Sequence, residues 1–176
     1  MEEYQASLLR NIIGQKVDPI ALQTVNSQVG STIWHIQLLE FTLIHYIVMV
    51  YGLEPGVERE TAFRVLDEVS VKTLGQLIAE LRKNNDLDER LDHRLKAFLK
   101  ERNWLIHRSR ADSHLAVYYP DKLAVLIRRL DTLTVEALNL RKAFTSRLEA
   151  FMIRIGRTER DIFMATVDQL KRQGVI

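Results

Sequence analysis

The sequence predicts an all-α protein, and three observations support this prediction. The chain of 176 residues contains only 7 Gly and 3 Pro, so few residues interrupt regular structure. Its apolar residues recur at spacings of three and four rather than two, which is the period of a helix. The length and the hydrophobic content of 47% suit a domain with a full core, and no repeat or linker divides the chain. We therefore expect a single helical domain over residues 1–176.

A long apolar helix is predicted from about Thr24 to Gly52, after a short helix at residues 2–16. Its second half is apolar on nearly every face, which is typical of a helix at the centre of a bundle. A membrane span is the alternative, because a span needs about 20 apolar residues, but Glu40 and His45 interrupt this one. We therefore expect no contact with a membrane.

Two shorter helices are predicted next, at residues 57–69 and 73–83. Asp86 and Glu89 then stand at the spacing of a capping box, in which two side chains satisfy the free N–H groups at the start of a helix. This spacing predicts a fourth helix from Asp86 to about Arg110.

The longest helix is predicted from Pro120 to about Ile155. Pro120 suits the first helical position, where its missing N–H costs nothing, and apolar residues follow at near-heptad spacing. Gly156 is predicted to end the helix, and a final short helix is predicted from Thr158 to about Gln173.

The basic charge of the chain is concentrated in the fourth predicted helix. The whole sequence holds 25 Lys and Arg against 23 Asp and Glu, so its net charge of +2 excludes a polycation that coats nucleic acid indiscriminately. Residues 90–110, in contrast, hold seven basic side chains and two acidic ones. This stretch is therefore expected to attract anions.

The composition also limits the chemistry. The absence of cysteine excludes a disulfide framework, a thiolate metal site and a cysteine nucleophile. The five histidines show no His-x3-His spacing, so we expect no metal and no cofactor. The acidic first residues lack the pattern of a secretory signal, and a cytoplasmic location is expected.

Two stripes are predicted along the fourth helix. One is apolar, and Arg102 projects onto its middle, which directs a guanidinium toward the core. Because burying an unpaired charge is costly, Arg102 requires either an ionic partner, for which Glu40 is the candidate, or a cavity or interface that admits an anion. The second stripe is polar, and a solvated face is its alternative interpretation. It consists of Lys96, Lys100, Asn103, His107 and Arg110.

The six residues from Arg102 to His107 read Arg-Asn-Trp-Leu-Ile-His. An Arg-x4-His spacing alone is common by chance, but an Asn directly after the Arg makes the compound motif informative. This motif resembles the R-x4-H motif of HEPN domains, a family of all-α bundles rich in metal-independent ribonucleases. The sequence departs from one toxin branch of that family, which carries a tyrosine where this chain has Ser109.

The resemblance implies an antiparallel helical bundle, with its core at residues 24–140 and a C-terminal helical extension at 141–176. Two copies would pair so that Arg102 and His107 of both face one cleft. Arg102 and Asn103 would hold the scissile phosphate of RNA, and His107 would act as general base or acid at the ribose 2′-hydroxyl. The product would be a 2′,3′-cyclic phosphate. The residues expected to bind the substrate are Lys96, Lys100, Arg108 and Arg110.

The predicted function is therefore an endoribonuclease of the toxin or antiviral-defence kind, acting as a homodimer on RNA, with a cognate antitoxin or regulatory protein as a further partner. One alternative is a catalytically inactive module of the same fold that binds RNA, a nucleotide or a protein. Another is a helical scaffold, in which residues 120–155 mediate assembly and Arg102 and Glu40 form a structural pair. Trp34 and Trp104 are expected to pack in the bundle, and Trp104 could instead stack on a base if it faces the cleft.

Overall fold

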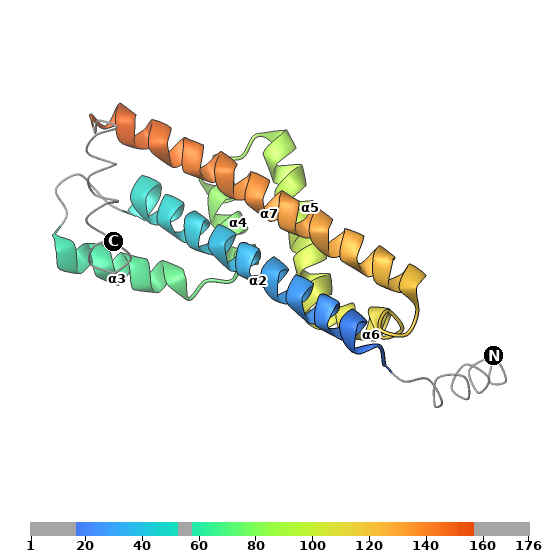
Figure 1. Cartoon of the computed structure of the whole chain (residues 1–176). Helices are drawn as coiled ribbons and strands as arrows, with labels where there is room; N and C mark the ends of the chain where they lie inside the picture. Colours follow the sequence, from blue (N-terminus) through green and yellow to red (C-terminus); the bar gives the residue numbers. More distant parts are fainter. Residues whose placement is uncertain (1–16, 53–57, 157–176) are drawn as a thin grey trace. The chain divides into compact units, whose positions relative to one another are not determined.

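A computed structural model describes residues 17–52 and 58–156 of the chain (Figure 1). The all-α class is confirmed, because these residues form helices and no strand. The predicted helices at 2–16 and 158–173 lie outside the described residues. The helices are α2 (Pro19–Ile47), the π-helix η1 (Val48–Gly52), α3 (Arg59–Ser70), α4 (Leu74–Lys83), α5 (Glu89–His107), α6 (Ser109–Ser113) and α7 (Pro120–Arg154).

The described residues divide into two compact units, and α2, α5 and α7 contribute to both. Unit 1 contains residues 17–37 and 93–137, and unit 2 contains residues 38–52, 58–92 and 138–156. The single domain over residues 1–176 stays a prediction.

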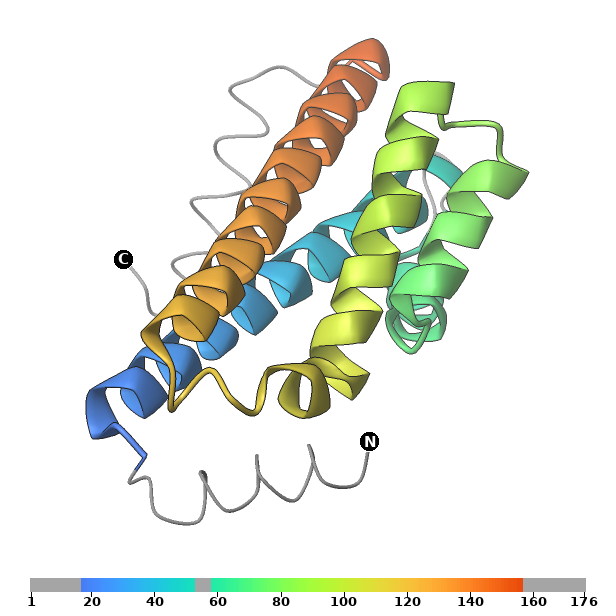
Figure 2. The same cartoon turned by 90° about the vertical axis from the view of Figure 1, so that its right-hand side faces the viewer.

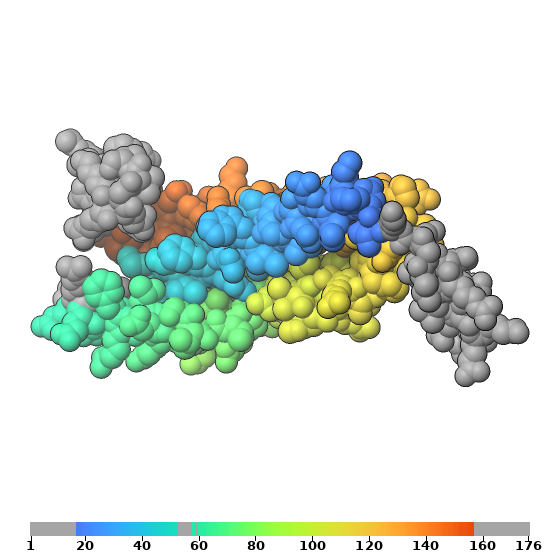
Figure 3. Space-filling model, turned by 60° about the horizontal axis from the view of Figure 1, so that its bottom comes forward, coloured from blue at the N-terminus to red at the C-terminus, as the bar shows by residue number. Residues whose placement is uncertain are grey.

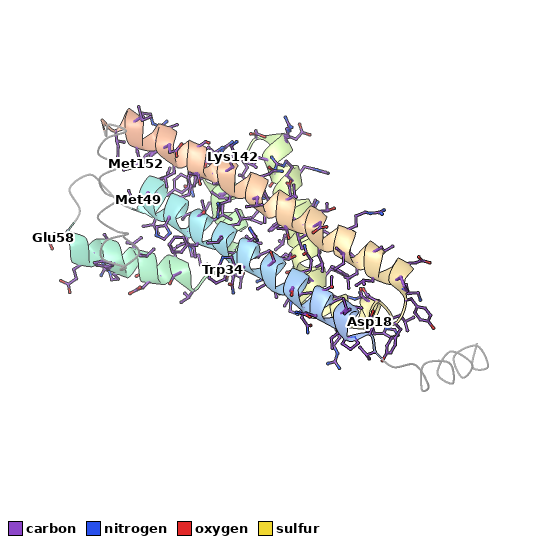
Figure 4. All side chains as sticks on the ribbon, in the orientation of Figure 1. Asp18, Trp34, Met49, Glu58, Lys142 and Met152 are labelled. Atoms are coloured by element: carbon purple, nitrogen blue, oxygen red, sulfur yellow. The ribbon has the colours of Figure 1, made fainter. Side chains whose placement is uncertain are left out.

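Helix α2 begins five residues before the predicted Thr24. The side chain of Asp18, labelled in Figure 4, accepts a hydrogen bond from the backbone N–H of Ile20 at 2.9 Å. Pro19 is the first helical residue, a position at which the backbone N–H has no acceptor within the helix, so the N–H that proline lacks is not needed. The Asp18-Pro19 pair thus starts this helix.

The start of α5 also differs from the prediction. Asp88, not Asp86, caps the helix, because its Oδ1 accepts from the N–H of Leu91 at 2.8 Å. Asn85 has a left-handed φ of 53° just after α4, a conformation that asparagine tolerates. The predicted capping box is therefore wrong, whereas the analogous box of Thr73 and Gln76 at the start of α4 is present.

In unit 1, α2 and α7 run parallel. Gln28 of α2 donates to Asp131 of α7, and one turn further along both helices the hydroxyls of Thr32 and Thr134 lie 2.9 Å apart. The predicted antiparallel arrangement does not extend to this pair of helices, which are not consecutive in the chain.

Helix α5 runs antiparallel to α7 in unit 1, and α6 forms the corner that joins them (Figure 2). Arg94 donates to Glu136 at 2.8 Å, and Arg129 donates to Glu101 at 2.7 Å. The hydrogen bond that Arg94 donates to Glu136 raises the pKa of Arg94. The apolar side chains buried in this unit include Leu95, Phe98, Leu105, Leu126, Leu130 and Leu133.

The segment Pro19–Gly52, which consists of α2 and η1, is long and apolar enough to cross a membrane by length and composition alone. The core helix of a soluble protein meets the same criteria. The expected lack of membrane contact and the cytoplasmic location stay predictions.

In unit 2, a cluster of tyrosines packs where α7 meets the residues before α5. The ring of Tyr46 lies edge-on to those of Phe144 and Tyr51, with centroids 5.3 and 6.2 Å away. Arg147 of α7 donates to the backbone carbonyl of Asp86 at 2.5 Å. Burial, followed by the neighbouring Asp86 carboxylate, raises the pKa of both Tyr46 and Tyr51. Asp86 therefore belongs to this cluster, which explains why it does not cap α5.

The raised pKa of Tyr51 predicts a loss of stability at high pH. The unfolded chain releases the tyrosine proton near pH 10, whereas the folded chain retains it, so the free energy of unfolding is unaffected below pH 10 and falls as the pH rises above it. The slope for one proton is at most about 1.4 kcal/mol per pH unit. Denaturant titrations at pH 8 and pH 11 should show a smaller loss in Tyr51→Phe than in the wild type. Equal losses in both proteins would contradict this assignment.

Candidate functional site

The apolar stripe predicted on α5 is present. Leu95, Phe98 and Leu105 are fully buried, and Arg102 lies between the last two on the same stripe. The Nε atom of Arg102 is buried, and Nη1 donates to the side-chain oxygen of Asn103 at 3.4 Å. The guanidinium thus lies at the edge of the core with one terminal nitrogen beside an exposed amide.

Glu40, the candidate partner of Arg102, is half-buried on α2 in unit 2, whereas Arg102 belongs to unit 1. The pairing of these two residues stays a prediction.

The predicted polar stripe is exposed on α5. Its members on this helix are Lys96, Lys100, Asn103 and His107. Among the described residues, no carboxylate forms an ion pair with Lys96 or Lys100, in contrast to the ion-paired Arg94. These two ammonium groups are therefore available to an external anion. Figure 3 shows the C-terminal part of α5 and α6, coloured yellow, beside the first half of α2 on one face of unit 1.

The stripe ends at His107, because α5 ends there. The hydroxyl of Ser109 donates to the carbonyl of Leu105 at 2.6 Å, which occupies one of the last free acceptors of the helix. Arg110 belongs to α6, so its predicted place on the α5 stripe is wrong. Arg108, the residue between the two helices, is exposed and approaches Asp112 at 4.0 Å.

The structure adds a network that the sequence did not reveal. Trp104 is buried, as predicted, whereas the packing predicted for Trp34 is wrong, because its side chain is exposed. The Nε1 of Trp104 donates to Asp112 of α6 at 3.0 Å. The guanidinium carbon of Arg129 lies 3.3 Å from the centre of the Trp104 ring, and the Nε of Arg129 donates to Glu101. One face of the indole is thus covered, which leaves it unsuited to stack between bases. Residues 101 and 129 belong to different helices, and no local spacing in the sequence indicates their pairing.

A cavity of about 430 Å³ lies at the corner of α5, α6 and α7. Trp104, Asp112 and Arg129 line it, together with apolar side chains that include Leu115 and Leu126. Arg102, Asn103 and His107 do not line this cavity. Asn103 and His107 are exposed on the surface of α5, whereas Arg102 is half-buried at the edge of the core. No group of three His, Cys, Asp or Glu side chains that could hold a metal occurs within residues 17–52 and 58–156.

The arrangement of α5 brings a guanidinium, an amide and an imidazole onto two successive turns. Four residues separate Asn103 from His107, a rise of about 6 Å along the helix. Arginine and asparagine can donate to phosphate oxygens, and an imidazole can accept or donate a proton. In-line displacement at phosphorus needs groups at both the attacking and the leaving oxygen, and one exposed helix reaches the phosphate from one side only. A second surface is thus needed to complete such a site.

Comparison of the chain with protein-family models, with curated proteins and with solved structures finds no match.

Proposed function

We propose that the protein is a metal-independent endoribonuclease of the HEPN type, whose active site is completed by the same helix of a second copy. The observation that carries the proposal is the placement of the motif on α5. Arg102 contacts Asn103 at the edge of the core, and His107 is exposed one turn further along, where a substrate can reach it.

In the proposed reaction, the imidazole of His107 removes the proton from the ribose 2′-hydroxyl. The 2′-oxygen then attacks the adjacent phosphorus, the bond to the 5′-oxygen breaks, and that oxygen takes up a proton from His107 of the second copy. Arg102 and Asn103 donate hydrogen bonds to the phosphate oxygens as negative charge develops on them. The products are a 2′,3′-cyclic phosphate and a 5′-hydroxyl, so atoms and protons balance without a metal.

The charge of the surface supports a polyanionic substrate. Lys100 and Lys96 lie one and two turns before Asn103 on the exposed face of α5, where they can contact phosphates of the same strand. Arg108 and Arg110, beyond the end of α5, would contact the strand on the opposite side of the scissile bond. A toxin or antiviral-defence role and a cytoplasmic location are parts of the same proposal, as is control by an antitoxin or regulatory protein.

The reaction chemistry gives a direct test. The purified protein, incubated with single-stranded RNA in EDTA, should produce fragments with cyclic phosphate ends, identified by mass spectrometry. A strand with one 2′-deoxynucleotide at the preferred cleavage position should resist cleavage there, because the nucleophile is absent. Binding of RNA without cleavage would contradict the proposal in favour of an inactive binding module. A monomer by light scattering at micromolar concentration would contradict the two-copy site.

A further inference from the structure

Trp104 divides the motif, because it lies between Asn103 and His107 in the sequence but faces the opposite way. Its ring is buried, whereas the side chains of Asn103 and His107 are exposed. All three belong to the last two turns of α5. Any rotation or fraying of these turns that displaces the indole therefore displaces the amide and the imidazole as well.

Arg129 of α7 contacts this part of α5 at two points. Its guanidinium stacks on the indole of Trp104 with a centroid distance of 3.3 Å, and its Nε donates to Glu101 at 2.7 Å. Glu101 and Trp104 are three residues apart and share one face of α5. Because the planar guanidinium of Arg129 binds both the indole of Trp104 and the carboxylate of Glu101, it fixes the rotation of α5 about its own axis as well as the distance of α5 from α7.

Apolar packing does not fix the indole on every side. The cavity of about 430 Å³ at the α5–α6–α7 corner borders both Trp104 and Arg129. Toward this cavity, the indole is held by the stack on Arg129 and by its hydrogen bond to Asp112. Its orientation therefore depends on these polar partners more than that of a side chain enclosed in a close-packed core.

We infer that Arg129 is a positioning residue for the candidate site, which sets the orientation of Asn103 and His107 through Trp104 and Glu101. The effect on catalysis rests on the proposed function. The effect on the conformation of α5 does not.

Three variants of the full chain test this inference. Arg129→Met keeps the length of the side chain but removes the stack and the ion pair. Arg129→Lys keeps the charge for Glu101 but not the planar group, and Glu101→Gln weakens only the ion pair. Arg128→Met is the matched control, because it makes the same change at the neighbouring, exposed position of α7.

Three readouts are measured for each variant. The first is amide hydrogen exchange over residues 103–108, which needs no activity. The second is RNA cleavage, separated into kcat and KM. A third signal comes from Trp34→Phe proteins, in which Trp104 is the only tryptophan and its emission reports the stack directly, because Trp34 itself is 63% exposed.

Arg129→Met should exchange faster at residues 103–108 and lose kcat by about 10- to 100-fold with little change in KM, because misplaced groups impair the transition state more than substrate binding. Arg129→Lys should recover part of kcat, and Arg128→Met should match the wild type. Wild-type exchange and Trp104 emission in Arg129→Met would overturn the inference, as would faster exchange throughout unit 1. A wild-type protein without activity would overturn the proposed function, while the exchange comparison would still decide the role of Arg129.

Discussion

Substitution of His107 by alanine should lower RNA cleavage by about 10²- to 10⁴-fold, the usual range for loss of a general acid or base. The side chain is exposed and forms no hydrogen bond or ion pair with the described residues, so the melting temperature should stay within about a degree of the wild type. Initial rates on a fluorescent RNA and a thermal melt of the same preparation measure both effects.

His93→Ala is the matched control for this prediction. His93 is another exposed histidine of α5, about four turns before His107 and outside the motif. The His93→Ala protein should cleave RNA at the wild-type rate. Equal activity of His107→Ala and the wild type would remove His107 from the mechanism, and equal loss in both variants would point to a general effect of surface charge.

Substitution of Arg102 by lysine should lower cleavage by about 10²- to 10³-fold, the cost of removing one donor that stabilises charge in a transition state. A lysine keeps the positive charge but cannot donate through a planar fork, and it lacks the nitrogen that lies buried at Nε. Cleavage rates and denaturant unfolding separate the catalytic loss from the structural one.

The same experiment separates the two interpretations of Arg102. If the residue serves catalysis, Arg102→Lys should fold with a stability close to the wild type and lose only activity. If it forms a structural pair with Glu40, then Arg102→Ala and Glu40→Gln should each lower the free energy of unfolding, and the double variant should lose less than their sum. Wild-type cleavage by Arg102→Lys would exclude the proposed role in phosphate binding.

Local signals in the sequence predicted much of this fold. The start of α4 at Thr73, Pro120 at the first position of α7 and Gly156 just after the end of α7 are each set by a few neighbouring residues. The apolar stripe of α5 was predicted for the same reason, because helical period alone decides which residues share a face. These features could be derived without knowing which helices pack together.

The errors arise where a distant partner competes with a local signal. Asp86 has the spacing of a cap, but Arg147, 61 residues later, binds its backbone carbonyl. The end of α5 was placed at Arg110, yet the bond from Trp104 to Asp112 holds α6 against the corner. The motif residues were predicted from the sequence, whereas the support from Arg129 and Glu101 was not, because a single sequence does not show which charges meet across helices.

The parallel pairing of α2 and α7 has a consequence for the timing of synthesis. Gln28 can form its hydrogen bond only after Asp131, 103 residues later, has been synthesised. Glu101, near the end of α5, likewise needs Arg129, which lies 28 residues after it. Contacts of such separation form only after a long loop has been closed, and synthesis at about 5–20 residues per second delays them further. A nascent chain that already exposes Arg102 and His107 therefore still lacks α7, the helix that holds the last turns of α5 in place.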